Sequence, residues 1–153
     1  MIEVQPRDPD LKPEWITAVR EAGETSLKHE KQLQDAGVTI VLSDDAEIQS
    51  LNNQFLGIDA PTDVLSFPAG ETDPDSGTLY LGDIIISLPR AVEQAERGNH
   101  PIEAELQLLV VHGILHLLGF DHAEDMDKQR MWQVQAEILG ALGSPIRYPA
   151  DTI

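Results

Sequence analysis

The chain has 153 residues, and its 27 acidic and 10 basic side chains give a formal net charge of −17. This length suffices for one hydrophobic core, so we expect residues 1–153 to form a single domain. The chain has no cysteine, so we expect neither disulfides nor thiolate ligands. Its N-terminus has no basic stretch before an apolar run, and no apolar run approaches the roughly 18–20 residues of a membrane helix. We therefore expect a cytoplasmic protein without membrane contact.

The first third of the chain alternates strand and helix patterns. A short strand is predicted at residues 2–4, and Pro13 begins an amphipathic helix. A second strand is predicted at residues 38–42. Asp44, with Glu47 three residues later, has the pattern of a capping box and predicts a helix to about residue 54.

The middle of the chain contains two further strand patterns. They cover residues 63–67 and 78–87, and the turn-rich, acidic segment 68–77 between them is expected to be a surface loop. Pro89 begins another helix. His100, in the break after this helix, has no metal-like spacing to other histidines and is expected at the surface.

A helix predicted at residues 104–118 is apolar on nearly all sides, which is typical of a buried central helix. His112 and His116 are four residues apart and share one face of it. Gly119 allows a left-handed helix end, so the chain can fold back and bring His122 to the same point. Three imidazoles suit a divalent ion, zinc first with other metals possible, bound at roughly 2.0–2.1 Å with one position open for water. Ordinary packing of the histidines in the core is the alternative. Each buried imidazole without a hydrogen-bond partner would then lower the folding stability by about 1–3 kcal/mol.

The histidine spacing also matches the metallopeptidase pattern H-E-x-x-H-x-x-G-x-x-H, except that Gly113 replaces the glutamate that acts as general base. The sequence therefore assigns no protein base and disfavours peptide hydrolysis. A metal-bound water, its pKa lowered towards about 7, can still hydrolyse a phosphodiester. Two carboxylates are candidates to orient the imidazoles: Glu105, seven residues before His112, and Asp121, next to His122.

A last amphipathic helix is predicted at residues 124–142. Together the elements predict an α+β fold in which helices pack around a small, mostly parallel sheet of about four strands, with a zincin-like central helix carrying the metal site.

Three motifs follow one another in the chain: TDVLSFP at residues 62–68, LGDIIIS at 81–87 and VHGILHLLGFDH at 111–122. In this order they resemble T-[DN]-V-L-S-F-P, L-G-D-I-x-I-S and H-G-x-L-H-L-x-G-[YF]-D-H of the YbeY family of bacterial metal-dependent endoribonucleases. The resemblance extends from about residue 38 to the C-terminal helix. It implies zinc on the three histidines and cleavage of single-stranded RNA in ribosomal RNA 3′-end maturation and ribosome quality control.

The family-like block also supplies candidate substrate contacts, for which capping and turn hydrogen bonds are the alternative role. They are Asn53, Thr62, Asp63 and Ser66. One position departs from the family pattern, because Leu56 follows Phe55 where the resemblance implies an arginine that meets substrate phosphates. A cation there would stabilise charge in the transition state, and Arg90 or Arg97 is the candidate to replace it.

The acidity contrasts with the basic surface that nucleic-acid binders usually present, and no lysine or arginine occurs between Lys31 and Arg90. Either scattered cations converge in the fold, or a basic ribosomal or accessory protein delivers the RNA, or the charge reflects solubility or an unusual cytoplasm. We favour the basic partner, with ribosomal RNA and the small ribosomal subunit as targets. A non-catalytic ribosome assembly factor stapled by its metal is the main alternative function, and a metallopeptidase is a weaker one.

Overall fold

A computed structural model describes residues 1–8, 11–30, 33, 35–120 and 124–146. In this part of the chain, four strands form one sheet in the order β1-β2-β4-β3. The strands are β1 (Ile2–Pro6), β2 (Gly37–Ser43), β3 (Val64–Thr72) and β4 (Leu79–Ser87). The helices are α1 (Pro13–His29), α2 (Asp45–Leu56), α3 (Leu88–Gly98), α4 (Ile102–Leu117) and α5 (Asp125–Ala141). The β1–β2 and β2–β4 pairs are parallel and β3 is antiparallel to β4, so the predicted α+β fold with a mostly parallel sheet is confirmed.

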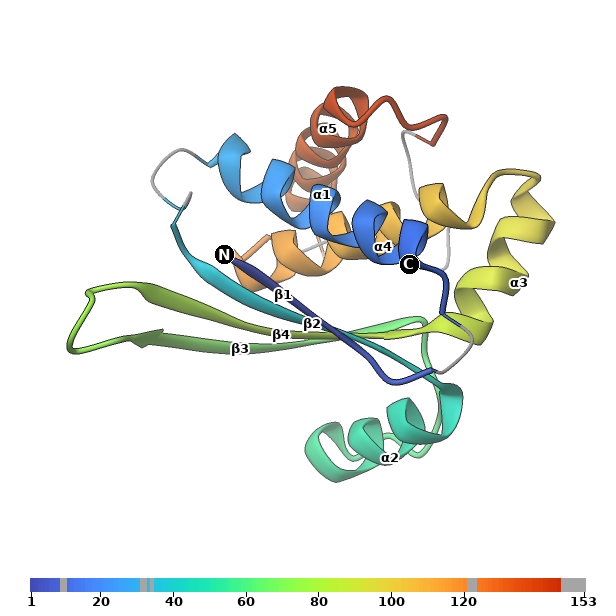
Figure 1. Ribbon diagram of the computed structural model, residues 1–153, viewed down its shortest axis with the longest axis horizontal. Helices are drawn as coiled ribbons and strands as arrows, with labels where there is room; N and C mark the ends of the chain where they lie inside the picture. The colour runs from blue at the N-terminus through green and yellow to red at the C-terminus, as the bar shows by residue number, and fades with distance from the viewer. Residues whose placement is uncertain (9–10, 31–32, 34, 121–123, 147–153) are drawn as a thin grey trace.

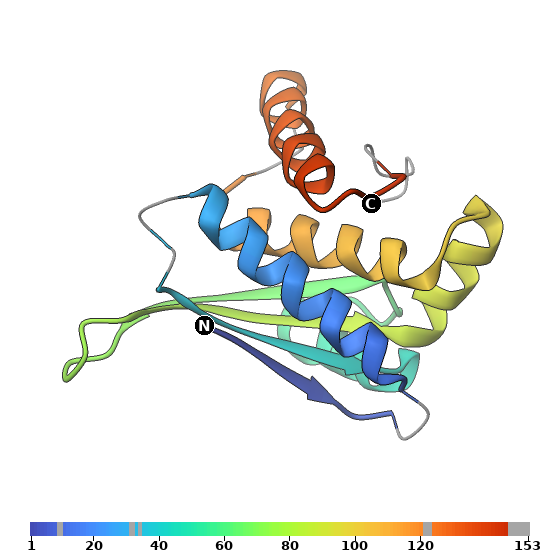
Figure 2. The same ribbon diagram turned by 45° about the horizontal axis from the view of Figure 1, so that its top comes forward.

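The helices divide between the two faces of the sheet. Helices α1, α4 and α5 lie on one side and α2 on the other (Figure 1). Helix α5 lies on the side of α1 and α4 that faces away from the sheet (Figure 2). Because side chains alternate along a strand, Ile84 and Ile86 enter the main core beneath α1 and α4, whereas Ile85 belongs to a smaller cluster with Ile48 of α2.

Helix α4 is the centre of the larger core. Every residue from 104 to 115 is buried, because the helix is covered by the sheet, α1, α3 and α5. Even Gln107 is held inside, where its Nε2 donates to the backbone oxygen of Ala18 in α1 at 3.1 Å. The prediction of a buried central helix is confirmed.

The hairpin of β3 and β4 is longer than predicted. Strand β3 continues to Thr72, so half of the segment expected as a surface loop is strand, and residues 73–78 connect the two strands. Pro68 has no amide hydrogen, but β3 is an edge strand whose register shifts between Pro68 and Glu71. A proline is tolerated at an edge strand and at a bulge, which is why it does not end this strand.

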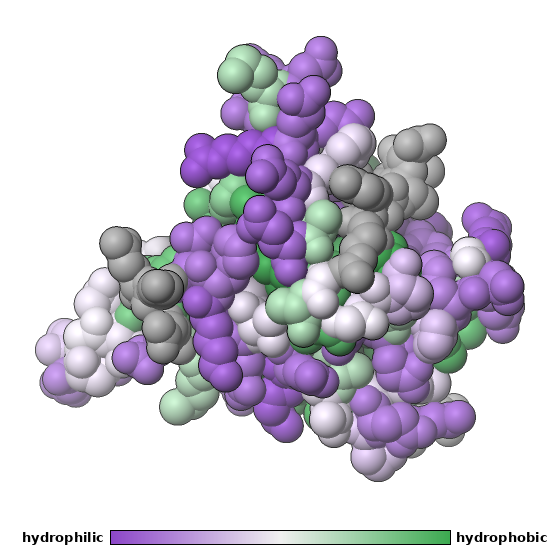
Figure 3. Space-filling model, turned by 90° about the horizontal axis from the view of Figure 1, so that it is seen from above, coloured by the Kyte–Doolittle hydropathy of each residue, from purple (hydrophilic) through white to green (hydrophobic). Residues whose placement is uncertain are grey.

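The face that carries α1, α4 and α5 is mostly hydrophilic in the space-filling view, where apolar residues show as small areas (Figure 3). In the described part of the chain, every helix is too short or too polar to cross a membrane.

We predict that Gly82→Ala destabilises the fold far more than Gly77→Ala. Gly82 has φ +146°, and a Cβ there would lie 2.2 Å from the backbone oxygen of Phe67. Gly77 also has a positive φ, +73°, but a Cβ there meets nothing within 4 Å. The contact with Phe67 should make the loss at Gly82 at least about 2 kcal/mol larger. Urea unfolding of both variants checks this, and equal losses would contradict it.

Candidate functional site

Two of the predicted metal ligands lie together on α4. His112 is 3% exposed, whereas His116 is only half-buried and lies nearer the surface. Their Nε2 atoms are 3.0 Å apart, and the ring planes are inclined at 81°. The spacing of four residues therefore directs one nitrogen of each ring to a common point.

Gln135 on α5 contacts the other side of the His112 ring. Its Oε1 lies 3.2 Å from Nδ1 of His112, and its side chain is completely buried. An amide oxygen can only accept, so this contact is a hydrogen bond when Nδ1 carries the hydrogen. A neutral ring in that tautomer has its lone pair on Nε2, the atom that faces His116.

This donor pair fits a divalent ion. Two nitrogens on one tetrahedral ion at about 2.0–2.1 Å are roughly 3.3 Å apart, close to the distance observed between the two Nε2 atoms. Gly119 has φ +94° and follows the end of α4, as the predicted turn requires. His122 and Asp121 lie outside the described residues. Within the described residues, no group of three His, Asp or Glu side chains is arranged to hold a metal.

Glu105 has a different partner from the one proposed for it. Its Oε2 lies 2.7 Å from Nε2 of His100, and both side chains are largely buried. His100 is therefore an inward-facing residue, and the expectation that it lies at the surface is wrong. Burial raises the pKa of Glu105 above its ordinary value, and the hydrogen bond to His100 opposes this rise without cancelling it.

Gly113 is explained by packing. A Cβ at this position would lie 3.0–3.3 Å from three atoms of the Ile84 side chain in β4. The side of α4 where the metallopeptidase pattern has its glutamate is thus closed by the sheet. The backbone oxygen of Gly113 also accepts a hydrogen bond from Oγ of Ser66 in β3 at 3.3 Å, so this candidate substrate contact links β3 to α4.

The remaining substrate candidates are spread over several elements. Asp63 accepts a hydrogen bond from Nε2 of Gln94 in α3 at 2.7 Å, and Thr62 precedes it in a half-buried position. Asn53 is exposed on α2, across the sheet from the histidines. Arg90 pairs through its Nε with Asp45 at 3.0 Å.

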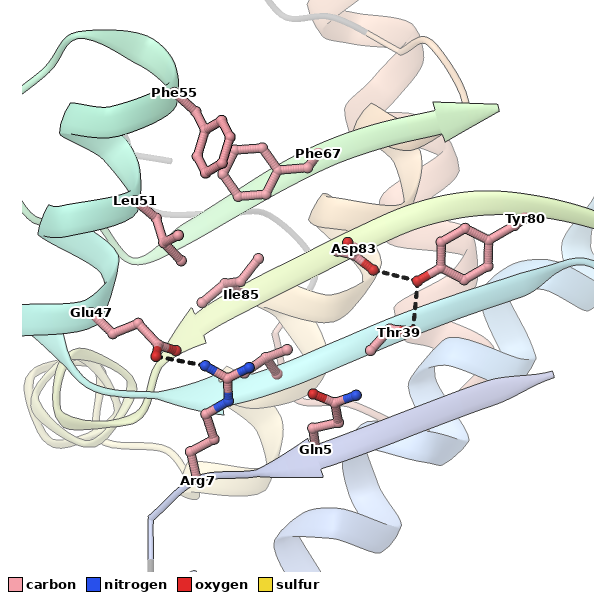
Figure 4. Close-up of a pocket in the computed structure, with 11 residues that line it drawn as sticks. Gln5, Arg7, Thr39, Glu47, Leu51, Phe55, Phe67, Tyr80, Asp83 and Ile85 are labelled. Carbon is pink, nitrogen blue, oxygen red and sulfur yellow. Dashed lines mark hydrogen bonds and ion pairs between the residues drawn. The ribbon is translucent and has the colours of Figure 1, made fainter. Parts of the chain in front are cut away.

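A cavity of about 650 Å³ lies on the α2 side of the sheet (Figure 4). Apolar residues such as Phe55 and Phe67 line one part, with ring centroids 5.4 Å apart. At one end Tyr80 donates to Asp83, and the Thr39 hydroxyl lies 2.6 Å from Oη of Tyr80. The cavity is distinct from the histidine pair, because its strand residues alternate with those that face α4.

Sequence reasoning missed both Gln135 and this cavity. The signal for Gln135 was present: it is a polar residue four positions after Met131 on the buried face of a predicted amphipathic helix. The cavity had no comparable signal, since its lining comes from β1, β2, α2, β3 and β4.

The protein-family model described as Endoribonuclease YbeY matches residues 1–143 of this chain. The protein called Endoribonuclease YbeY from Pelotomaculum thermopropionicum is 44% identical over 124 residues, which cover 79% of this chain and 82% of the relative. Its namesake from Halalkalibacterium halodurans is 43% identical over 137 residues, covering 83% and 86%. The solution structure of a Thermotoga maritima protein matches with a TM-score of 0.59 and 31% identity over 99% of this chain and 97% of that one.

We predict that Glu105→Gln gains stability relative to the unchanged protein as the pH rises. The pKa of the Glu105 carboxyl is raised in the folded state, so its protonation stabilises the fold. This stabilisation is fully present below the ordinary pKa of 4.5 and is lost as the pH rises through the folded-state pKa. Glutamine has no such proton to lose. Urea unfolding at several pH values from about 4 to 7 measures the difference. Glu103→Gln, on the same turn of α4, is the matched control; a difference that falls with pH would contradict the prediction.

Proposed function

The chain belongs to the Endoribonuclease YbeY family, and from this premise we propose that it is a single-strand-specific, metal-dependent endoribonuclease of ribosomal RNA 3′-end maturation and ribosome quality control. The family match supports RNA as substrate and hydrolysis as the reaction. The observation that supports metal dependence is the pair of Nε2 atoms of His112 and His116 on α4, which lie 3.0 Å apart.

In this proposal His112, His116 and His122 hold one zinc ion, which when bound supplies Lewis acidity and an activated water for attack on a phosphodiester. His112 is fixed from behind by Gln135, and the half-buried His116 lies at the open side. No side chain of the described residues is assigned as general base. The surroundings of Gly113 agree with this, because a Cβ at the position where peptidases have their glutamate would already lie 3.0–3.3 Å from Ile84.

The RNA must reach a protein with a net charge of −17. Arg7, Arg90 and Arg97 each pair with a carboxylate in the structure, which reduces their availability to phosphates. This supports delivery of ribosomal RNA by the small ribosomal subunit or by a basic ribosomal or accessory protein. We place this activity in the cytoplasm, in a single domain of residues 1–153 that contains the whole metal site.

A second function, a non-catalytic ribosome assembly factor, is favoured by one observation. Leu56, 57% exposed at the end of α2, occupies the position where the family resemblance implies an arginine. A leucine cannot stabilise the charge that develops on a phosphate in the transition state.

We predict that cleavage requires both the metal and His116. The metal-replete protein should produce discrete new ends in a 3′-extended small-subunit ribosomal RNA, free or in particles. Chelation or His116→Ala should remove them, because two imidazoles hold a catalytic ion much less firmly than three. End mapping is the measurement, and His29→Ala, which affects a histidine paired with Glu137, is the matched control.

Uncut RNA with the folded, metal-bound protein would overturn the nuclease proposal and favour the assembly factor. Cleavage of casein that chelators abolish would instead support the metallopeptidase.

We predict that Leu56→Arg lowers the KM for RNA and raises kcat/KM by at least about tenfold, because it adds a cation that can bind substrate phosphates where the family pattern has one. The exposed position accepts the longer side chain without burying its charge. Thr72→Arg, an equal change of charge on the exposed end of β3, controls for net charge. Equal gains in both variants would show a general electrostatic effect, and no gain would contradict a role for this position.

A further inference from the structure

Gln135 is the residue through which α5 reaches the histidines. Its side chain is completely buried, and its Oε1 accepts the hydrogen bond from Nδ1 of His112. Its amide nitrogen is also buried and has no hydrogen-bond partner among the described residues. An unpaired buried amide group is unfavourable for folding, so an apolar residue of the same size would suit this core position better. The carbonyl oxygen is the part of Gln135 that has a defined role.

We propose that Gln135 is a positioning residue that holds His112 in its Nδ1–H tautomer, with the Nε2 lone pair directed towards His116 and the metal position. A neutral imidazole carries one hydrogen and one lone pair, and the hydrogen bond at one nitrogen decides which nitrogen keeps the lone pair. Because Oε1 of Gln135 only accepts, it stabilises the tautomer with hydrogen on Nδ1. The ring is thereby prepared before an ion arrives.

The group that accepts the hydrogen bond from His112 is an uncharged amide rather than a carboxylate. Carboxylates behind a ligating histidine raise the basicity of the ring, whereas an amide orients it without adding charge. In the metal-free protein the amide also avoids a buried carboxylate in the apolar surroundings of Met131 and Leu139 on the same helix. Gln135 thus favours a stable metal-free fold over the tightest possible metal binding.

The test compares Gln135→Met with Gln107→Met. Both substitutions replace a buried glutamine by an apolar residue of similar size, and both remove a hydrogen bond, but Gln107 bonds to the Ala18 backbone and not to a histidine. Nitrogen-15 NMR of the labelled histidine rings in the metal-free protein reports the tautomer. Zinc affinity is measured by competition with a chromophoric chelator.

We expect the Nδ1–H tautomer of His112 in the unchanged protein and in Gln107→Met, and a shift towards the Nε2–H tautomer in Gln135→Met. Zinc affinity should fall about 10–100-fold in Gln135→Met only. Gln135→Glu, which keeps an acceptor at the same place, should restore zinc affinity to at least that of the unchanged protein, while its metal-free form is less stable.

An unchanged tautomer in Gln135→Met would overturn the proposal. Equal loss of zinc affinity in Gln135→Met and Gln135→Glu would also overturn it, since the residue would then act through packing alone. The affinity measurement rests on the proposed metal function, but the tautomer measurement does not. If the unchanged protein binds no zinc, the metal proposal fails, while the NMR result still decides the role of Gln135.

Discussion

The close contact between Gly113 of α4 and Ile84 of β4 is the constraint on which the rest of the structure depends. Any side chain at position 113 would meet Ile84, which is itself fully buried. The helix can therefore lie directly against the sheet, and another side of it, with His112, is turned towards α5. The residue that brings the helix onto the sheet is also the one that removes the peptidase base. Gly113 thus links the packing of α4 to the absence of the glutamate found in the metallopeptidase pattern.

Alternation along the strands separates two potential sites. Ile84 and Ser66 pair across β3 and β4 and face α4, whereas Asp83 and Phe67 form the next pair and line the cavity beside α2. Since side chains of successive strand residues point to opposite faces, closeness of motif residues in the sequence does not place them in one site. The LGD and LSF segments therefore contribute to both faces of the sheet.

The sequence predicted the elements well where periodicity or a cap marked them. Helix α4 is apolar on nearly all sides and is buried, and Asp44 accepts a hydrogen bond from the amide of Glu47 as the capping pattern requires. Pairings between distant segments were harder to predict. The extension of β3 past Pro68 depends on an edge position and a bulge, which local sequence does not reveal. Glu105 was predicted to orient an imidazole of the metal site, but its bond to His100 depends on how α3 and α4 meet.

Charge and ligand type are linked in the proposed site. The protein carries a net charge of −17, which opposes the approach of RNA, and screening in salt weakens that repulsion only beyond about 10 Å. The three proposed ligands and Gln135 are all neutral groups, so a divalent ion would keep its full charge there. A carboxylate among them would cancel part of that charge where a phosphate must bind. With neutral ligands the proposed ion itself would be the main local attraction for a phosphodiester on this acidic protein.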